Sequence, residues 1–319
     1  MGMLNERAMR LVRDLLGEPE YFNIKAHRLT NGATVIDMGA EVAGSWAAAE
    51  YFTRITLGDL CSFSYGRWQH DAETSFAAVQ LAVDRPLIAC LASQIAGWQL
   101  GSGEFATIGS GPARAVAAVE GDPYMEMTPY RESAEEVVLC VQDSSMPTAE
   151  MAASVAEKCR VAPEKVYLLL APAACLVGSV QVSARILEQV CHKMYENGFD
   201  VAKVTNCRGA APIAPIVKDE VKSMGRINDA LLYAGETEFW VDAEDEEIRR
   251  VIGRLSSKDS SPQYGVLFED IFEAAGRDFY YIDHQVHSIG QIRIHSVRSG
   301  AAFSAGEYHR ELIGRSFLS

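Results

Sequence analysis

An arginine and a glutamate three residues apart are the side chains in this sequence best suited to acid–base chemistry. Arg185 and Glu188 lie in a segment whose apolar residues recur with helical spacing and which ends at Asn197-Gly198. Side chains three apart on a helix are neighbours, so the arginine can keep the carboxylate ionised and oriented. Such a carboxylate in a cleft is a good general base. On an open helix face the same pair would be an ordinary ion pair worth ~0.3–0.5 kcal/mol, and the spacing alone favours that interpretation.

A second candidate is the glycine-rich turn GSGPAR, residues 109–114. Pro112 suits the first turn of a helix, whose free N–H groups, together with Arg114, would suit a phosphate or carboxylate. The turn is neither a GxGxxG motif nor a P-loop, because no Lys-Ser/Thr follows it. Close backbone packing also explains the glycines. The turn therefore leaves an anion site and a purely structural role open.

Composition narrows the class of protein. The chain has 319 residues, and its net charge of -14 argues against nucleic acid or an anionic membrane as the main partner. No apolar run approaches the ~20 residues that span a bilayer. The seven cysteines form no CxxC pair, so we expect buried thiols in a reducing cytoplasm. No HExxH motif or Cys/His cluster is present, and we predict no metal site.

The elements that must position these residues follow from periodicity and turn signals. The N-terminal half predicts a helix over 4–16, a hairpin around Asn31-Gly32, a strand over 74–83 and a helix from Pro86 to Gly97. Residues 39–60 fit either a strand with loops or a short helix around 47–52. The C-terminal half predicts strands at 136–141, 165–170, 200–205, 238–241, 280–282, 291–297 and 301–303. It also predicts helices at 147–160, 180–196, 218–224, 228–233, 245–255, 264–275 and 308–313.

This mixture of hairpins and strand–helix units indicates an α+β fold, or mixed α/β, rather than a purely doubly wound sheet. The length favours two domains. We place the first over residues 1–120, with the hairpin and the GSGPAR turn. The second covers 121–319 and carries the Arg185/Glu188 helix.

Several separate stretches resemble the methenyltetrahydromethanopterin cyclohydrolase family. They are CLASQIAGWQ at 90–99, GSGPARAV at 109–116, APAACLVGSVQVSARILE at 171–188, PIAPI at 212–216, MGRIND at 224–229 and YGVLFEDIFEAAGRDFYYID at 264–283. The resemblance is collinear over nearly the whole chain. GSGPAR and GSVQxSxR are specific only together. One departure is TNCRGAA at 205–211, so we transfer no roles to that stretch.

The resemblance implies a cytoplasmic hydrolase of one-carbon metabolism. It would reversibly convert the N5,N10-methenyl form of a tetrahydromethanopterin-type carrier, with water, to the N5-formyl form. The family has two α+β domains with a substrate pocket between them, forms homotrimers and needs no metal or prosthetic group. Its catalytic pair corresponds to Arg185 and Glu188 here. Whether the carrier's tail is phosphorylated, and whether the pathway oxidises formaldehyde or leads to methane, stays open.

The chemistry suits these residues. A methenyl bridge is a delocalised cation with an electrophilic carbon, and one carboxylate can first deprotonate the attacking water and then protonate the departing nitrogen. We expect Glu188 in that role, held by Arg185, with Gln181 positioning the water. Gln94, Ser110, Arg114 and Ser183 are further candidates for substrate binding. The alternatives are a phosphoryl transferase using the glycine loops at 101–103 and 109–111, and a non-catalytic pterin-carrier-binding protein.

Overall fold

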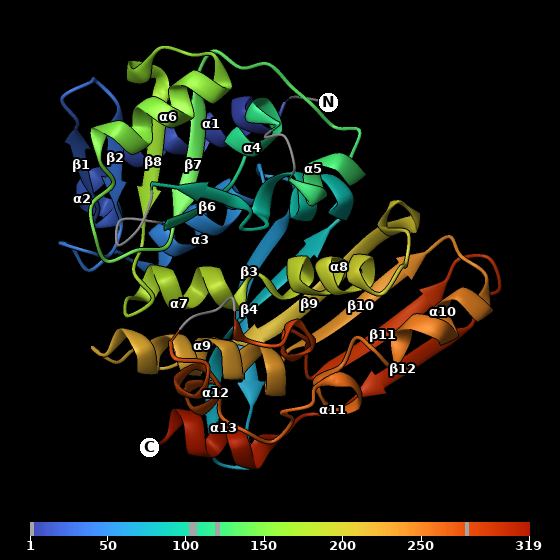
Figure 1. Ribbon diagram of the computed structural model, residues 1–319. Helices are drawn as coiled ribbons and strands as arrows, with labels where there is room; N and C mark the ends of the chain where they lie inside the picture. The colour runs from blue at the N-terminus through green and yellow to red at the C-terminus, as the bar shows by residue number, and fades with distance from the viewer. Residues whose placement is uncertain (1–2, 102–106, 119–121, 278–280) are drawn as a thin grey trace. The chain divides into compact units, whose positions relative to one another are not determined.

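The computed structural model describes residues 3–101, 107–118, 122–277 and 281–319, and it has the predicted α+β fold (Figure 1). The chain forms two compact units. Unit 1 comprises Met1–Cys61 and Ile88–Gln181, and unit 2 comprises Ser62–Leu87 and Val182–Ser319. The expected division at residue 120 falls inside unit 1, because strands on either side of it pair in one sheet. Part of the glycine loop at 101–103, and Tyr280 of the expected strand at 280–282, lie outside the described residues.

Unit 1 is built on a six-stranded sheet in the order β1-β2-β8-β7-β6-β5. The strands are β1 Lys25–Arg28, β2 Thr34–Asp37, β5 Trp98–Leu100, β6 Thr107–Ser110, β7 Val137–Val141 and β8 Val166–Leu170. The predicted hairpin at Asn31-Gly32 is confirmed, with Gly32 at a positive φ of 88°. Strands β2, β8 and β7 are parallel, so their carboxyl ends meet at one edge of the sheet.

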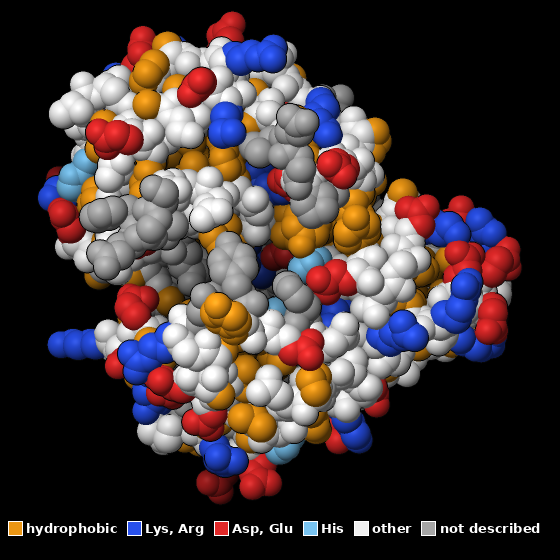
Figure 2. All heavy atoms as spheres, in the orientation of Figure 1, with side chains coloured by type: hydrophobic (Ala, Val, Ile, Leu, Met, Phe, Trp, Pro, Cys, Tyr) orange, Lys and Arg blue, Asp and Glu red, His pale blue; other side chains and the backbone are white. Residues whose placement is uncertain are grey.

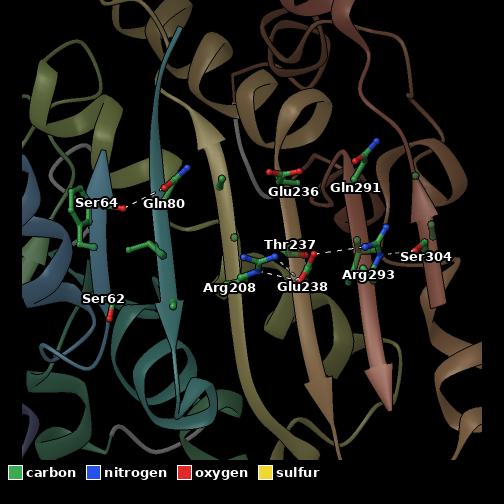
Figure 3. Close-up of a pocket in the computed structure, with 18 residues that line it drawn as sticks. Ser62, Ser64, Gln80, Arg208, Glu236, Thr237, Glu238, Gln291, Arg293 and Ser304 are labelled. Carbon is green, nitrogen blue, oxygen red and sulfur yellow. Dashed lines mark hydrogen bonds and ion pairs between the residues drawn. The ribbon is translucent and has the colours of Figure 1, made fainter. Parts of the chain in front are cut away.

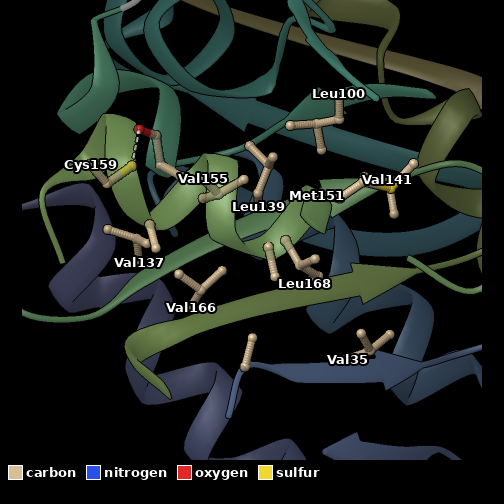
Figure 4. Close-up of a cluster of buried hydrophobic side chains, with 14 of the residues drawn as sticks. Val35, Leu100, Val137, Leu139, Val141, Met151, Val155, Cys159, Val166 and Leu168 are labelled. Atoms are coloured by element: carbon tan, nitrogen blue, oxygen red, sulfur yellow. Dashed lines mark hydrogen bonds between the residues drawn. The ribbon is translucent and has the colours of Figure 1, made fainter. Parts of the chain in front are cut away.

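The helical elements of unit 1 are α1 Leu4–Gly17, α2 Pro19–Phe22, α3 Trp46–Thr56, α4 Ala113–Ala117, α5 Pro123–Met127, α6 Ala149–Cys159 and the 3-10 turn η3 Pro163–Lys165. Helices α1, α3 and α4 contact β7 of this sheet, and α6 contacts β8. Of the two structures predicted for residues 39–60, the helix is the one that forms, as α3. Figure 4 shows the core on the α6 side, where Met151 and Val155 pack over Leu139 and Leu168. The central strands are apolar on both faces, as is typical of parallel strands buried between helices.

Unit 2 carries the second six-stranded sheet, in the order β12-β11-β10-β9-β4-β3. Its strands are β3 Ser62–Gln69, β4 Ser75–Val83, β9 Val204–Pro212, β10 Glu236–Val241, β11 Gln291–Ser296 and β12 Ala302–Gly306. All neighbours pair antiparallel except β10 and β11. The helices α8 Ile186–Glu196 and α10 Asp245–Ile252 lie on one face of the sheet (Figure 1). A largely antiparallel sheet of this kind can leave its other face to solvent.

The remaining elements of unit 2 are the 3-10 turn η4 Val201–Lys203 and the helices α9 Glu220–Ala234, α11 Ser257–Ser260, α12 Phe268–Ala274 and α13 Arg310–Phe317, with η6 His284–Val286. Helix α9 runs unbroken through Gly225, where we expected two helices. A Cβ on Gly225 would lie 2.9 Å from the Cβ of Glu269, so this glycine permits close packing of α12. The expected strand at 280–282 is not formed by Tyr281 and Ile282.

Acidic and basic side chains are interspersed on the face shown in Figure 2. The mixed cluster at the right of that view lies over α10, whose first turn is acidic and whose last turn carries Arg249 and Arg250. This arrangement complements the helix dipole and leaves no large basic patch on α10. Among the described residues, no helix combines the length and the apolar character that crossing a bilayer requires.

A buried carboxylate joins three helices of unit 2. Asp229 on α9 is 1% exposed, and it accepts hydrogen bonds from the backbone N–H of Phe268 on α12, at 2.8 Å, and from the hydroxyl of Ser316 on α13, at 2.7 Å. Burial raises the pKa of Asp229 from 3.8 to about 7, against the opposing effect of these two hydrogen bonds. The carboxyl group therefore favours its neutral form below about pH 7 in the folded protein.

This pKa predicts how stability depends on pH. A carboxyl whose pKa is higher in the folded than in the unfolded chain contributes stability below pH 3.8 that is lost as the pH rises through 7. Asp229→Asn keeps the acceptor for the N–H of Phe268, can donate through Nδ2 to the hydroxyl of Ser316, and cannot ionise. At pH 8 we therefore expect it to be more stable than wild type by up to ~4 kcal/mol. Urea unfolding at pH 4, 6 and 8 measures this difference. The surface variant Glu157→Gln is the control, and equal pH profiles for Asp229→Asn and wild type would contradict the prediction.

Candidate active site

The predicted helix over 180–196 is in fact two helices, and the break places the candidate catalytic pair. Helix α7 spans Leu176–Ser183, and α8 begins at Ile186 with Arg185 as its N-cap residue. Glu188 therefore sits in the first turn of α8, where the positive end of the helix dipole favours a carboxylate. No residue type marks the break in advance, because neither proline nor glycine occupies it.

Arg185 and Glu188 are in contact and largely buried. The guanidinium Nη1 lies 3.6 Å from the carboxylate Oε2, and the two side chains are 15% and 10% exposed. The separation is longer than a hydrogen bond but within ion-pair range. The two residues are therefore not an ordinary solvent-exposed ion pair, and charges that are shielded from water attract each other more strongly. The guanidinium of Arg185 is therefore placed to orient the carboxylate of Glu188.

The start of α8 is fixed by close contacts within unit 2. The hydroxyl of Ser183 donates to the carbonyl of Pro212 at 3.0 Å. Gln189 donates through Nε2 to the carbonyl of Ser288 at 2.8 Å. A Cβ on Gly235 would lie only 2.3 Å from Cδ1 of Ile186, which shows how closely the turn between α9 and β10 approaches α8. These contacts restrain the turn that carries Glu188. Substrate contact by Ser183 stays a prediction.

Two other candidates lie near the carboxyl end of β7 in unit 1. Gln181 donates through Nε2 to Oε1 of Gln142 at 2.6 Å, and Gln142 directly follows β7. Ser110 on β6 is paired with Cys140 on β7. The carboxyl ends of parallel strands are where open α/β sheets bind ligands. Gln142 was not among the predicted site residues, because no motif or spacing marks it.

The helix expected over 86–97 is a π-helix, η1 Leu87–Gln94, continued by a bond from the N–H of Ile95 to the carbonyl of Cys90 at 2.8 Å. Two of its carbonyls bind the GSGPAR turn. Ser93 accepts from the N–H of Gly111 at 2.7 Å, and Leu91 accepts from Nη1 of Arg114 at 3.0 Å. Turns of π-helix are frequent at functional sites. The structure thus brings together the motifs at 90–99 and 109–116.

Gln94, the last residue of η1, and Arg114, which binds η1, are both buried. Gln94 is 1% exposed and donates through Nε2 to the hydroxyl of Thr56 at 3.3 Å. Arg114 forms a buried ion pair with Asp122, with Nη2 2.5 Å from Oδ2 and side-chain exposures of 1% and 4%. A carboxylate of the chain itself therefore occupies this guanidinium, which gives Arg114 a structural role. Ligand contact by Arg114 or Gln94 stays a prediction.

A hollow of about 810 Å³ lies on the face of the unit 2 sheet opposite α8 (Figure 3). Arg208 and Arg293 flank Glu238 there, with the nearer arginine nitrogen 3.0 Å and the farther one 3.9 Å from its carboxylate. None of the predicted site residues lines this hollow. Its charges largely compensate one another, so it has no evident preference for a ligand of one sign.

Comparisons with known proteins support the family resemblance that the motifs indicate. A family model described as Cyclohydrolase (MCH) matches residues 3–317. The chain belongs to this cyclohydrolase family. Two relatives, both named methenyltetrahydromethanopterin cyclohydrolase, come from Methanococcoides burtonii and Methanothermobacter marburgensis. The first is 36% identical over 318 residues, which is 99% of this chain and 98% of the relative. The second is 37% identical over 321 residues, which is 99% of this chain and 99% of the relative.

A third relative of the same name, from Methanococcus maripaludis strain C5, is 38% identical over 319 residues, which is 99% of this chain and 98% of the relative. The resemblance stated from the sequence is thereby confirmed. Membership of the cyclohydrolase family makes this chain a hydrolase, and it gives no support to a phosphoryl transferase.

Proposed function

We propose that this cyclohydrolase hydrolyses the N5,N10-methenyl form of a tetrahydromethanopterin-type carrier reversibly to the N5-formyl form. The observation that carries the proposal is the largely buried Arg185/Glu188 pair in the first turn of α8. It occurs in a chain that matches proteins named for this substrate along nearly its whole length. The reaction belongs to one-carbon metabolism, and we place it in the cytoplasm.

The proposed steps follow from one carboxylate acting twice. Water attacks the methenyl carbon while Glu188 accepts one of its protons, which neutralises the cationic bridge and leaves a hydroxyl on that carbon. Glu188 then returns the proton to N10, the bond from carbon to N10 breaks, and the hydroxyl proton leaves to solvent as the formyl C=O forms. One proton is released overall. Base and acid roles of this kind are typically worth ~10²–10⁴-fold in rate.

Arg185 would keep Glu188 charged and oriented until the first proton transfer, and Gln181 would position the water. The bridging carbon is already electrophilic, so the mechanism needs neither a metal nor a prosthetic group. We propose Gln94, Ser110, Arg114 and Ser183 as further residues of the carrier site. Their support is the family's motifs and, for Ser110 and Gln181, their place at the carboxyl end of β7.

A direct assay tests the proposed substrate. We expect purified enzyme to remove the absorbance of the methenyl-tetrahydromethanopterin chromophore without added cofactor, and to act weakly or not at all on methenyl-tetrahydrofolate. The expectation rests on relatives that are all named for the methanopterin carrier. Equal kcat/KM values for the two carriers would refute the proposed specificity. Binding without loss of the chromophore would instead indicate a non-catalytic carrier-binding protein.

We also propose that the enzyme is a homotrimer, as the resemblance to the family implies. Closed rings of identical chains are a common form of soluble oligomer. Multi-angle light scattering should then give three times the 34.9 kDa of one chain. A mass that stays at 34.9 kDa over a hundredfold range of protein concentration would contradict a trimer.

A further inference from the structure

Three potential metal ligands converge beside the first hairpin of unit 1. His27 lies on β1, Asp37 ends β2, and Glu41 follows in the next loop. Asp37 is paired with Lys25 across the hairpin, so His27, two residues further along β1, projects on the same face as Asp37. One ligand atom from each of His27, Asp37 and Glu41 lies within 4.8 Å of the other two.

Asp37 is the fixed member of the cluster. It is 0% exposed, and its carboxylate accepts the N–H groups of Gly39, Ala40 and Glu41 at 3.0, 2.7 and 2.7 Å. Within the described part of the chain, no lysine, arginine or histidine nitrogen lies within the 4.0 Å of an ion pair with it. Buried charges in proteins are normally paired or bound to a metal. The same three bonds orient the backbone that presents Glu41.

His27 supplies a nitrogen ligand. Its Nε2 atom is buried, makes no hydrogen bond to the described residues, and lies 3.6 Å from Oε2 of Glu41. Ligand atoms bonded at ~2.1 Å to one divalent ion stand ~3.0–3.4 Å apart. A shift of a few tenths of an ångström would therefore bring these two atoms to coordination distance. A neutral imidazole is the commonest metal ligand in proteins.

Lys25 occupies the position of a competing cation. Its Nζ lies 2.7 Å from the same Oε2 of Glu41, and the two side chains are 53% and 52% exposed. An exposed pair of this kind contributes little, ~0–1 kcal/mol. Lys25 can therefore move away when a doubly charged ion neutralises both Asp37 and Glu41.

We propose that His27, Asp37 and Glu41 form a binding site for a divalent transition-metal ion such as Zn²⁺. One imidazole and two carboxylates suit zinc and its first-row neighbours better than calcium. The ion would tie the hairpin to the loop at 38–41. That loop packs closely on residues leading into α7, because a Cβ on Gly39 would lie 2.2 Å from Sγ of Cys175. The three protein ligands leave at least one coordination position to water, and the hydrolysis proceeds without the ion.

Zinc titration of chelator-treated enzyme tests the site. We expect calorimetry to show one Zn²⁺ per chain and Co²⁺ to give visible d–d bands. His27→Gln should weaken Zn²⁺ binding by at least ~100-fold, since even loss of an outer-shell partner costs 10–100-fold. The matched control is His295→Gln. His295 lies 3.8 Å from Glu238 with a similar exposure of 26%, but it is not in the three-residue cluster, so its loss should leave zinc binding unchanged.

A second variant keeps the test independent of folding. Lys25→Met removes the competing charge at an exposed position and should tighten Zn²⁺ binding roughly two- to fivefold. Absence of stoichiometric zinc binding, or equal binding by wild type and folded His27→Gln, would overturn the site. Weaker binding by Lys25→Met would also contradict it. None of these results bears on Glu188, because turnover is measured on the metal-free enzyme.

Discussion

Glu188→Gln is expected to lower kcat by at least ~100-fold while the protein stays folded. Glutamine keeps the size and much of the hydrogen bonding of the side chain, but it can neither accept the proton of the attacking water nor balance the cationic bridge. A solvated surface pair would predict an almost unchanged kcat. The burial of Glu188 and its place in the first turn of α8 argue for the large effect.

The measurement is stopped-flow absorbance of the methenyl chromophore, with circular dichroism as the check on folding. Glu196→Gln is the matched control, because Glu196 lies in the last turn of the same helix and pairs with His192 at 3.2 Å. Arg185→Ala should also be severe, and the double variant should lose little more than Glu188→Gln, since the two residues act as a unit. Near wild-type turnover by Glu188→Gln would contradict the proposed mechanism.

Arg114→Met is expected to destabilise unit 1 by ~3–5 kcal/mol, because it leaves the carboxylate of Asp122 buried without its partner. Adding Asp122→Asn should restore much of that loss. Asparagine can still accept from the N–H groups of Tyr124 and Met125, as Asp122 does at the start of α5. Equilibrium unfolding in urea measures both effects.

The control for Arg114→Met is Arg10→Met, which removes an exposed pair with Glu6 and should change stability by no more than ~0.5 kcal/mol. Similar losses for Arg10→Met and Arg114→Met would show that burial of the second pair does not matter. The doubly substituted protein at positions 114 and 122 also tests carrier binding. If Arg114 contacts the carrier, KM rises more than kcat falls.

Elements with strong local signals were predicted correctly from the sequence. The hairpin at Asn31-Gly32, β7, β8 and α6 each carry their own turn, cap or apolar run. The errors arose where distant parts of the chain decide the local structure. The glycine at 225 predicts a helix end, but in the fold it permits the close packing of α12. The break before α8 accompanies contacts with Pro212 of β9 and with Gly235, which precedes β10.

The candidate site was predicted in part. The spacing and the family resemblance selected Arg185 and Glu188, but their burial and the N-cap position of Arg185 depend on tertiary structure. The partner of Gln181 lies 39 residues away and that of Arg114 sits beyond a helix, so neither was evident. The cluster of His27, Asp37 and Glu41 lacks a motif because strand register and a loop create it, and we had expected no metal.

The division of the chain into units has a consequence during synthesis. Because unit 2 takes its first strands from Ser62–Leu87 and the rest from Val182 onward, no contiguous fragment contains either unit alone. Strand β4 cannot pair with β9 until β9 has been synthesised, since Ala78 of β4 pairs with Pro212 of β9. A ribosome needs on the order of ten seconds to synthesise the residues between these two strands. Throughout that time the β3–β4 hairpin exposes an edge and the apolar side chains of Val79, Leu81 and Val83. The nascent chain is therefore a natural client for chaperones that hold hairpins, and truncations ending before β9 should aggregate.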